Sequence, residues 1–202
     1  MVALYSKKIK QMKKTKSVEL LDQQQSYVRK IIATTTLVRQ EDPELLLRPP
    51  APGKWSVIQT LEHLNSYGRY YLPAIENAMK ESNGSQEWFS PGWLGNYFTN
   101  MMLPKNGVVT NKMQAPKDHR PSSDLDVQPV MDEFLKQQNQ LLDLLEAAKK
   151  KNIGAIRVPI SISKILKLKL GDTFRFFVAH EQRHLVQVHL ALQACKSQLA
   201  KV

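Results

Sequence analysis

Long segments without helix breakers, in which apolar residues recur every three or four positions, constrain the fold of this chain more than any other feature. No set of segments alternates apolar and polar residues with the two-residue period of a sheet. Amphipathic helices bury their apolar faces most simply against one another. The sequence therefore predicts an all-α protein, a four-helix bundle with long helices over residues 17–40, 56–79, 127–150 and 172–199.

The connection between the second and third of these helices is too long for a simple turn. Residues 83–124 contain glycines, prolines and aromatic residues, and they are expected to carry structure of their own. A short helix is predicted over 91–101, with Ser90 as its cap and Pro91 at its first position. The bundle is thus expected to have one long crossover, between helices 2 and 3.

The second helix has a clear start. Ser56 and Gln59 match the capping box, in which two side chains bond to backbone amides of the first turn. Trp55 precedes the cap and is predicted to act as a hydrophobic staple. Pro73 lies inside the helix and predicts a kink or an early end.

The segment before the last helix contains glycines at both ends. Residues 154–171 are expected to form a loop, with a short helix near 161–166. Asp172 is the expected cap of the last helix, because aspartate is among the preferred N-cap residues.

Charge is distributed unevenly along the chain. The formal net charge is +11, and six lysines before Ser17 account for more than half of it. Residues 1–16 are therefore expected to form a basic arm, and residues 17–202 a single bundle domain. In that domain Lys and Arg alternate with acidic residues, and the basic and aromatic motifs of RNA-binding modules are missing. Nucleic acid is not an expected partner.

Several features favour a cytoplasmic protein. No apolar run reaches the roughly 18 residues of a membrane span, so no membrane association is expected. The first lysines are not followed by the apolar region of a secretory signal. Cys195 is the single cysteine, which excludes an internal disulfide and fits a reducing compartment.

His180 and His184 are four positions apart, which places both on one face of a helix. With Glu181 they match the H-E-x-x-H helix of zinc proteases. The extended protease motif requires Gly and His where this chain has Gln187 and Leu190. No acidic residue follows Glu181 to supply a downstream ligand. Taken alone, the pair is more typical of hydrogen-bonded histidines than of a metal site, and protease activity is not expected.

A third ligand has to come from an earlier segment. His63 lies in the well-capped second helix, whereas His119 lies in a polar loop and is expected to be solvated. His189 lies about 180° around the last helix from His180. His63, His180 and His184 are therefore the candidate ligands of one divalent transition metal. Three neutral ligands leave a position open for water or substrate.

Two motifs resemble a known family. Residues 54–64, KWSVIQTLEHL, are similar to W-S-x-x-E-x-x-x-H-L, and residues 180–187, HEQRHLVQ, are similar to H-x-x-x-H-L-x-Q. These are motifs of the DinB-like or YfiT-like helical bundle proteins, and the likeness covers most of the chain beyond the arm. The resemblance implies a four-helix bundle, a three-histidine site for nickel, zinc or a similar ion, and a homodimer.

The chain departs from the family motif at Gln59, where many members have glutamate. Glutamine cannot act as a general base. Glu181 is the nearest alternative candidate for a catalytic residue, with a salt bridge or solvated charge as its other interpretation. Tyr67 is a second candidate, because Tyr67 and Tyr70 lie on the face of His63 and either line the open side of the metal or pack in the core.

Two functions follow from these features. The first is a metal-dependent enzyme that hydrolyses a small molecule or transfers a thiol, since the family includes thiol-dependent transferases and isomerases. A small-molecule substrate, such as a thiol, is then the expected partner. The alternative is a non-catalytic metal-binding or stress-response bundle, which the lack of a dedicated base at Gln59 also fits.

Overall fold

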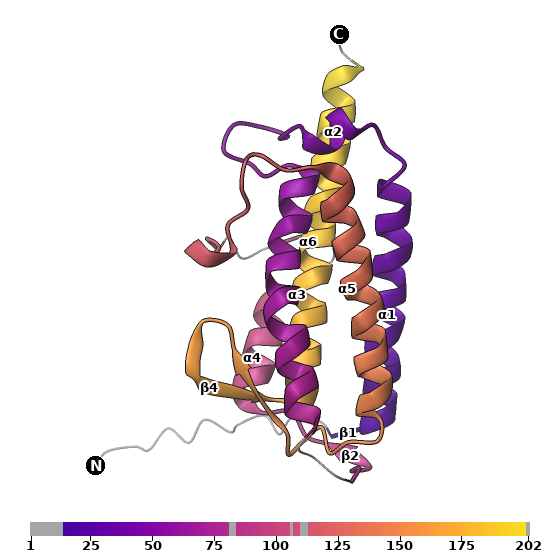
Figure 1. Cartoon of the computed structure of the whole chain (residues 1–202), viewed down its shortest axis with the longest axis vertical. Coiled ribbons are helices and arrows are strands. Elements are labelled where there is room, and N and C mark those ends of the chain that lie inside the picture. Colours follow the sequence, from indigo (N-terminus) through magenta and orange to yellow (C-terminus); the bar gives the residue numbers. More distant parts are fainter. Residues whose placement is uncertain (1–13, 81–83, 106, 110–112, 201–202) are drawn as a thin grey trace, which may run out of the picture.

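Four long helices form the body of the molecule (Figure 1). The computed structural model describes residues 14–80, 84–105, 107–109 and 113–200. Helices α1 and α3 each pack against both α5 and α6. The predicted four-helix bundle is confirmed, with the long helices α1 (Ser17–Val38), α3 (Val57–Lys80), α5 (Val127–Ala148) and α6 (Leu170–Leu199).

The directions of the helices explain the long crossover. Two contacts show that α3 and α5 run parallel. Asn65 of α3 bonds to the carbonyl of Val130 of α5, and about one turn further along both helices Arg69 pairs with Glu133. Helix α6 runs in the opposite direction to α3 (Figure 1). Two consecutive parallel helices require the chain to return along the bundle between them. The expected crossover between these two helices is therefore confirmed.

The crossover carries a strand and two short helices. These elements are β2 (Trp88–Phe89), α4 (Trp93–Met102) and the 3-10 helix η1 (Lys117–His119). Strand β2 pairs antiparallel with β1 (Thr15–Lys16), which leads into α1. Helix α4 packs on α6, and η1 lies beside α3. A further short helix, α2 (Pro43–Leu47), joins α1 to α3.

Helix α4 begins later than predicted. Its N-cap is Gly92, so Ser90 and Pro91 both precede the helix. Asp172 is also not a cap of its own helix, because α6 already begins at Leu170. The buried carboxylate of Asp172 instead accepts a hydrogen bond of 2.7 Å from the backbone N–H of Gly92. A negative charge at the N-terminus of α4 interacts favourably with its helix dipole.

A β-hairpin replaces the short helix predicted near 161–166. Strand β3 (Arg157–Ile160) pairs antiparallel with β4 (Ser163–Lys169). Val158 lies opposite Leu168 in this ladder, and both are buried. In β3 the buried Val158 and Ile160 alternate with the less buried Arg157 and Pro159, which is the two-residue period of a strand. Packing of the alternate residues on the bundle therefore decides the conformation of this segment.

The start of α3 has the predicted capping box. The backbone N–H of Gln59 donates to Ser56 Oγ at 3.1 Å, and Gln59 Oε1 accepts from the backbone N–H of Ser56 at 3.0 Å. The helix continues past Pro73 to Lys80, so the early end considered for it does not occur. Burial of Ile75 and Met79 beyond the proline stabilises this last part of the helix.

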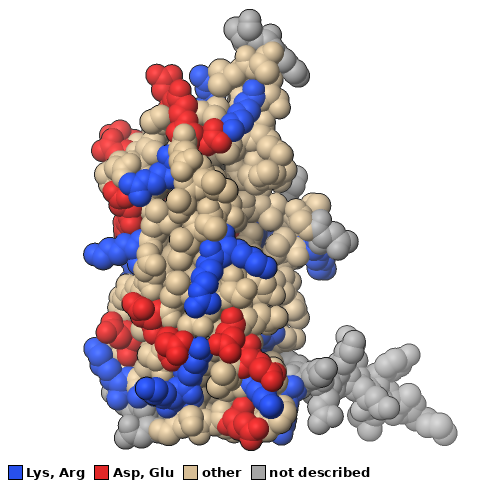
Figure 2. Space-filling view, turned by 90° about the vertical axis from the view of Figure 1, so that its right-hand side faces the viewer, with Lys and Arg blue, Asp and Glu red and all other residues tan. Residues whose placement is uncertain are grey.

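Acidic and basic side chains are interleaved on the surface seen from the α1 side (Figure 2). Two ion pairs join α1 and α5. Lys149, just after α5, pairs with Asp22 of α1, and Arg39, just after α1, pairs with Asp132 of α5. Of the predicted basic arm, residues 1–13 lie outside the described residues, and Thr15 and Lys16 form β1. Among the described helices, none is long and apolar enough to cross a membrane.

Candidate metal centre

His63, His180 and His184 form a buried cluster between α3 and α6. Their exposed fractions are 3%, 3% and 7%. The Nε2 atom of His180 lies 3.4 Å from Nε2 of His63 and 3.0 Å from Nε2 of His184. One ligand atom from each ring lies within 4.8 Å of the other two. The structure therefore brings together the three histidines singled out in the sequence.

The spacing of the three nitrogens suits a metal ion. In a tetrahedral site with metal–nitrogen bonds of 2.0 to 2.1 Å, neighbouring ligand nitrogens are about 3.3 Å apart. The two Nε2 separations, 3.4 and 3.0 Å, are close to this value. Helix geometry accounts for the shorter one, because His180 and His184 lie one turn apart on the same face of α6.

The backbone of η1 fixes the proton on His63. Its Nδ1 lies 2.6 Å from the carbonyl oxygen of His119, and a carbonyl can only accept a hydrogen bond. Nδ1 therefore carries the proton, and the lone pair of Nε2 points into the cluster. Metal-binding histidines are oriented in this way by a partner on the other ring nitrogen.

Burial keeps all three rings neutral at neutral pH. It lowers the pKa of His63 to about 4, against the opposing effect of the hydrogen bond to the His119 carbonyl. It lowers the pKa of His184 to about 3, and the nearby His63 adds to the effect. The pKa of His180 falls well below its usual value through burial, and its interactions with His184 and His63 also disfavour protonation. Neutral imidazole is the form that binds a metal.

His119 is not the solvated loop residue expected from the sequence. Its ring stacks on Tyr67 with 3.8 Å between ring centroids, and its Nδ1 lies 2.9 Å from Ser66 Oγ. The ring nitrogens of His119 are outside the three-histidine cluster. The residue therefore contacts the site through its backbone carbonyl and its ring face.

Of the two tyrosines, Tyr67 lies in the site and Tyr70 does not. The ring of Tyr67 lies 4.5 Å from the ring of His180, between centroids. Burial, with the neighbouring Tyr71, raises the pKa of Tyr67 to about 12, so its phenol stays protonated. Tyr70 instead donates its hydroxyl hydrogen to the carbonyl of Ile160 in the β-hairpin.

Glu181, the candidate carboxylate base, and Gln59, which stands in place of the family glutamate, both lie outside the three-histidine cluster. Glu181 is buried against α5, where its Oε1 accepts a hydrogen bond of 2.7 Å from Gln138. Burial raises the pKa of Glu181 to about 8. The Oε1 atom of Gln59 accepts the hydrogen bond of the capping box, and its Nε2 donates to the carbonyl of Ser122. Its role is therefore to hold the crossover loop against the start of α3.

A cavity of about 850 Å³ opens beside the cluster. The three histidines form part of its wall, together with Trp55, Thr60 and Tyr67. The ring of Trp55 lies 4.9 Å from that of His63, between centroids, so this residue borders the site in addition to preceding the helix cap. Its place before the cap in the sequence gave no sign of this contact. A cavity of this size accommodates a small molecule.

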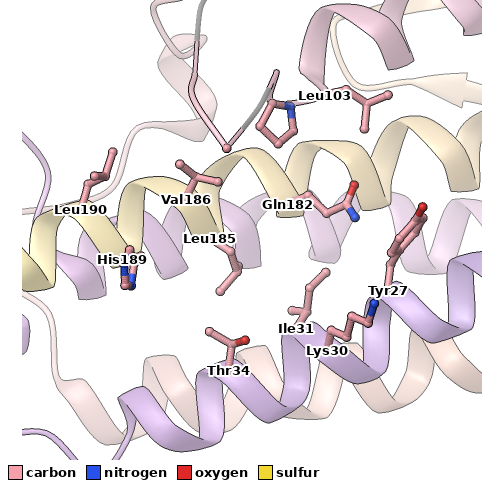
Figure 3. A pocket seen from close by; sticks show the side chains of 12 residues that line it. Tyr27, Lys30, Ile31, Thr34, Leu103, Gln182, Leu185, Val186, His189 and Leu190 are labelled. Atoms are coloured by element: carbon pink, nitrogen blue, oxygen red, sulfur yellow. The ribbon is translucent and has the colours of Figure 1, made fainter.

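His189 lies in a separate groove of about 660 Å³ between α1 and α6 (Figure 3). Tyr27 and Ile31 of α1 and Leu185 of α6 line this groove, and His189 lies near its end. Cys195 is buried near the end of α6 and donates to the carbonyl of Arg48. Neither side chain belongs to the three-histidine cluster.

Fold and site together define a helical bundle protein with a buried three-histidine cluster that is compatible with a divalent metal ion. The sequence model of the DinB superfamily matches residues 20–188, which include all three histidines. The chain belongs to the DinB superfamily. Searches among curated proteins and among solved structures gave no match.

Proposed function

We propose that this protein is a metal-dependent enzyme that hydrolyses a small molecule or transfers a thiol. The observation that carries the proposal is the convergence of three neutral histidines on the wall of a cavity of about 850 Å³. Nickel or zinc is the proposed ion, because imidazole nitrogen is a preferred ligand of both. Structural metal sites usually have four protein ligands, whereas three ligands beside a cavity leave a position open for a substrate.

The residues around the cluster have separable roles in this proposal. A divalent ion on three neutral ligands polarises a bound water or thiol strongly, because no anionic ligand offsets its charge. His63, His180 and His184 hold the ion, and the His119 carbonyl orients His63. Tyr67, protonated and beside His180, is placed to donate a hydrogen bond to a substrate.

No protein carboxylate is essential as a base in this scheme. Among the described residues that line the cavity, none is aspartate or glutamate. Glu181 faces α5 through Gln138, and Gln59 is held in the capping box. We therefore expect Glu181→Gln to retain most of any activity found by screening thiol conjugation and small-ester or amide hydrolysis. A large loss with metal still bound would show that the carboxylate is catalytic.

Metal content is the first test. Protein purified without an affinity tag should contain about one ion per chain by mass spectrometry, as a site with three histidine ligands implies. His63→Ala and His184→Ala should lose this ion. His189→Ala is the matched control, because it removes an exposed histidine of the same helix outside the cluster. Metal-free wild-type protein that binds neither zinc nor nickel on addition would refute the proposal.

A non-catalytic metal-binding bundle is the second candidate. The observation that favours it is the same absence of acidic residues from the described cavity wall. Under this alternative, His63→Ala loses the metal, but no tested reaction depends on the metal. Substrate-dependent turnover by metal-loaded protein would exclude it.

A further inference from the structure

The charged side chains that line the cavity are all positive among the described residues. They are Lys54, Arg120 and Arg183, and they come from three parts of the chain. Lys54 precedes α3, Arg120 follows η1 and Arg183 lies on α6. The cavity wall thus combines positively charged side chains from segments that are distant in the sequence.

Arg183 lies closest to the histidines in the sequence, next to His184 on α6, and lines the cavity with His180 and His184. Only 5% of its surface is exposed, although it lines the cavity. Its guanidinium group is thus held in the same cavity wall as the three histidines.

Arg120 is fixed at the border of the cavity. Its Nε–H donates to the carbonyl of Ala115 at 3.0 Å, and both residues line the cavity wall. This bond uses one donor of a guanidinium group that carries five. The loop that carries Arg120 is held to α3 through Gln59 and Ser122. The cation is therefore part of the same structure that positions His63.

The cationic wall of the cavity differs in charge from the surface on the α1 side. On the α1 side, red and blue side chains are mixed (Figure 2). Ion pairs such as Lys149–Asp22 balance the charges there. A concave site lined by one sign of charge concentrates ligands of the opposite sign.

We propose that the cavity binds small anionic molecules, such as carboxylates, and that Arg183 and Arg120 hold the anionic group while the rest of the molecule faces the histidine cluster. This inference rests on the proposed function for the cluster and adds the class of substrate. Guanidinium groups bind carboxylate oxygens in a two-bond geometry, which suits them to this task. Trp55 and Met102, also in the wall, provide apolar surface for the body of the ligand.

The test compares two probes that differ in one charge, 4-mercaptobenzoate and 4-mercaptobenzamide. Both are titrated by calorimetry into zinc-loaded protein and into chelator-treated protein. The acid should bind at least about tenfold more tightly than the amide, as expected for a charge-assisted hydrogen bond. The preference should persist without metal, because it comes from side chains of the chain.

Variants assign the preference to named residues. Arg183→Gln should bring the ratio of the two affinities close to one, and Arg183→Lys should keep part of the preference. Arg120→Gln lowers the ratio as well, and this exposed residue can be replaced without disturbing the core. Lys30→Gln is the matched control, since Lys30 lines the other groove and should leave the ratio unchanged.

Equal affinity for acid and amide in wild-type protein would overturn the inference, as would a preference that both arginine variants retain in full. A preference seen only in the metal-loaded protein would also overturn it, because the ion would then bind the anion. If the protein binds no metal but still prefers the acid, the proposed metal function fails and the anion site stands.

Discussion

Ser66 connects two parts of the candidate metal centre although it is not a candidate ligand. Its hydroxyl donates to the carbonyl of His63 at 2.7 Å, so its oxygen accepts the Nδ1–H of His119, 2.9 Å away. His119 in turn orients His63 through its backbone carbonyl. Removal of a partner that orients a metal-binding histidine weakens metal affinity by about 10- to 100-fold.

Ser66→Ala should therefore weaken the affinity for zinc by about tenfold, which is measured by competition with a chromogenic chelator. Thr36→Ala is the matched control, because Thr36 makes the same kind of hydroxyl bond within α1, to the carbonyl of Ile32. Equal zinc affinity in both variants would show that the His119 loop keeps its place without Ser66.

Glu181 predicts a pH dependence of stability in the metal-free protein. Its pKa in the folded state is about 8, above the ordinary value of 4.5, because burial disfavours the charge. As pH rises, the unfolded chain loses this proton at a lower pH than the folded protein. The free energy of unfolding therefore falls progressively between about pH 4.5 and about pH 8. Glu181→Gln should remove this loss, with a gain of a few kcal/mol at pH 8 and little change at pH 4.

Urea unfolding at a series of pH values measures this effect. The difference in the free energy of unfolding between Glu181→Gln and wild type should grow with pH over that window. His189→Ala serves as the control for loss of an exposed titratable group on the same helix. A difference that does not change with pH would mean that Glu181 is already charged in the folded protein.

Close contact between α4 and α6 depends on Gly95. A Cβ atom at this position would lie 2.3 Å from Cβ of Asp172 on α6. Gly95→Ala should lower the free energy of unfolding by about 1 to 3 kcal/mol, because overpacking outweighs the gain in helix propensity. Asn100 is an exposed position of the same helix, so Asn100→Ala should be neutral or stabilising. Thermal unfolding of both variants and wild type measures the difference.

At the scale of elements, apolar periodicity predicted the four long helices, and the Ser56–Gln59 capping box predicted the start of α3. The β-hairpin could not be predicted in this way, since Val158 and Leu168 become strand residues only by packing on the bundle. The start of α4 was also missed, because its interaction with Asp172 comes from 80 residues away in the sequence.

At the scale of the molecule, the three histidines could be singled out because His180 and His184 are one helical turn apart and His63 lies in a well-capped helix. The surroundings of the cluster could not be predicted from the sequence. The His119 carbonyl reaches His63 only through the folded crossover, and Arg120 reaches the cavity by the same route. Short-range spacing thus identifies candidate ligands, whereas long-range packing determines their orientation and the charge around them.

The site joins α3 to α6, so metal binding should stabilise the whole bundle. A ligand that binds only the folded state at 100 times its dissociation constant adds about 2.7 kcal/mol to the free energy of unfolding. For a chain of 202 residues this corresponds to a rise of roughly 5 to 11 °C in the melting temperature.

Calorimetric melting of chelator-treated protein, with and without added zinc or nickel, measures this rise. His63→Ala should abolish it, because the remaining pair lies on α6 alone and no longer links two helices. His189→Ala should retain it in full, and excess chelator should reverse it in wild type. An equal rise in wild type and His63→Ala would show that the ion binds elsewhere, and the three-histidine cluster would then have to be explained without a metal.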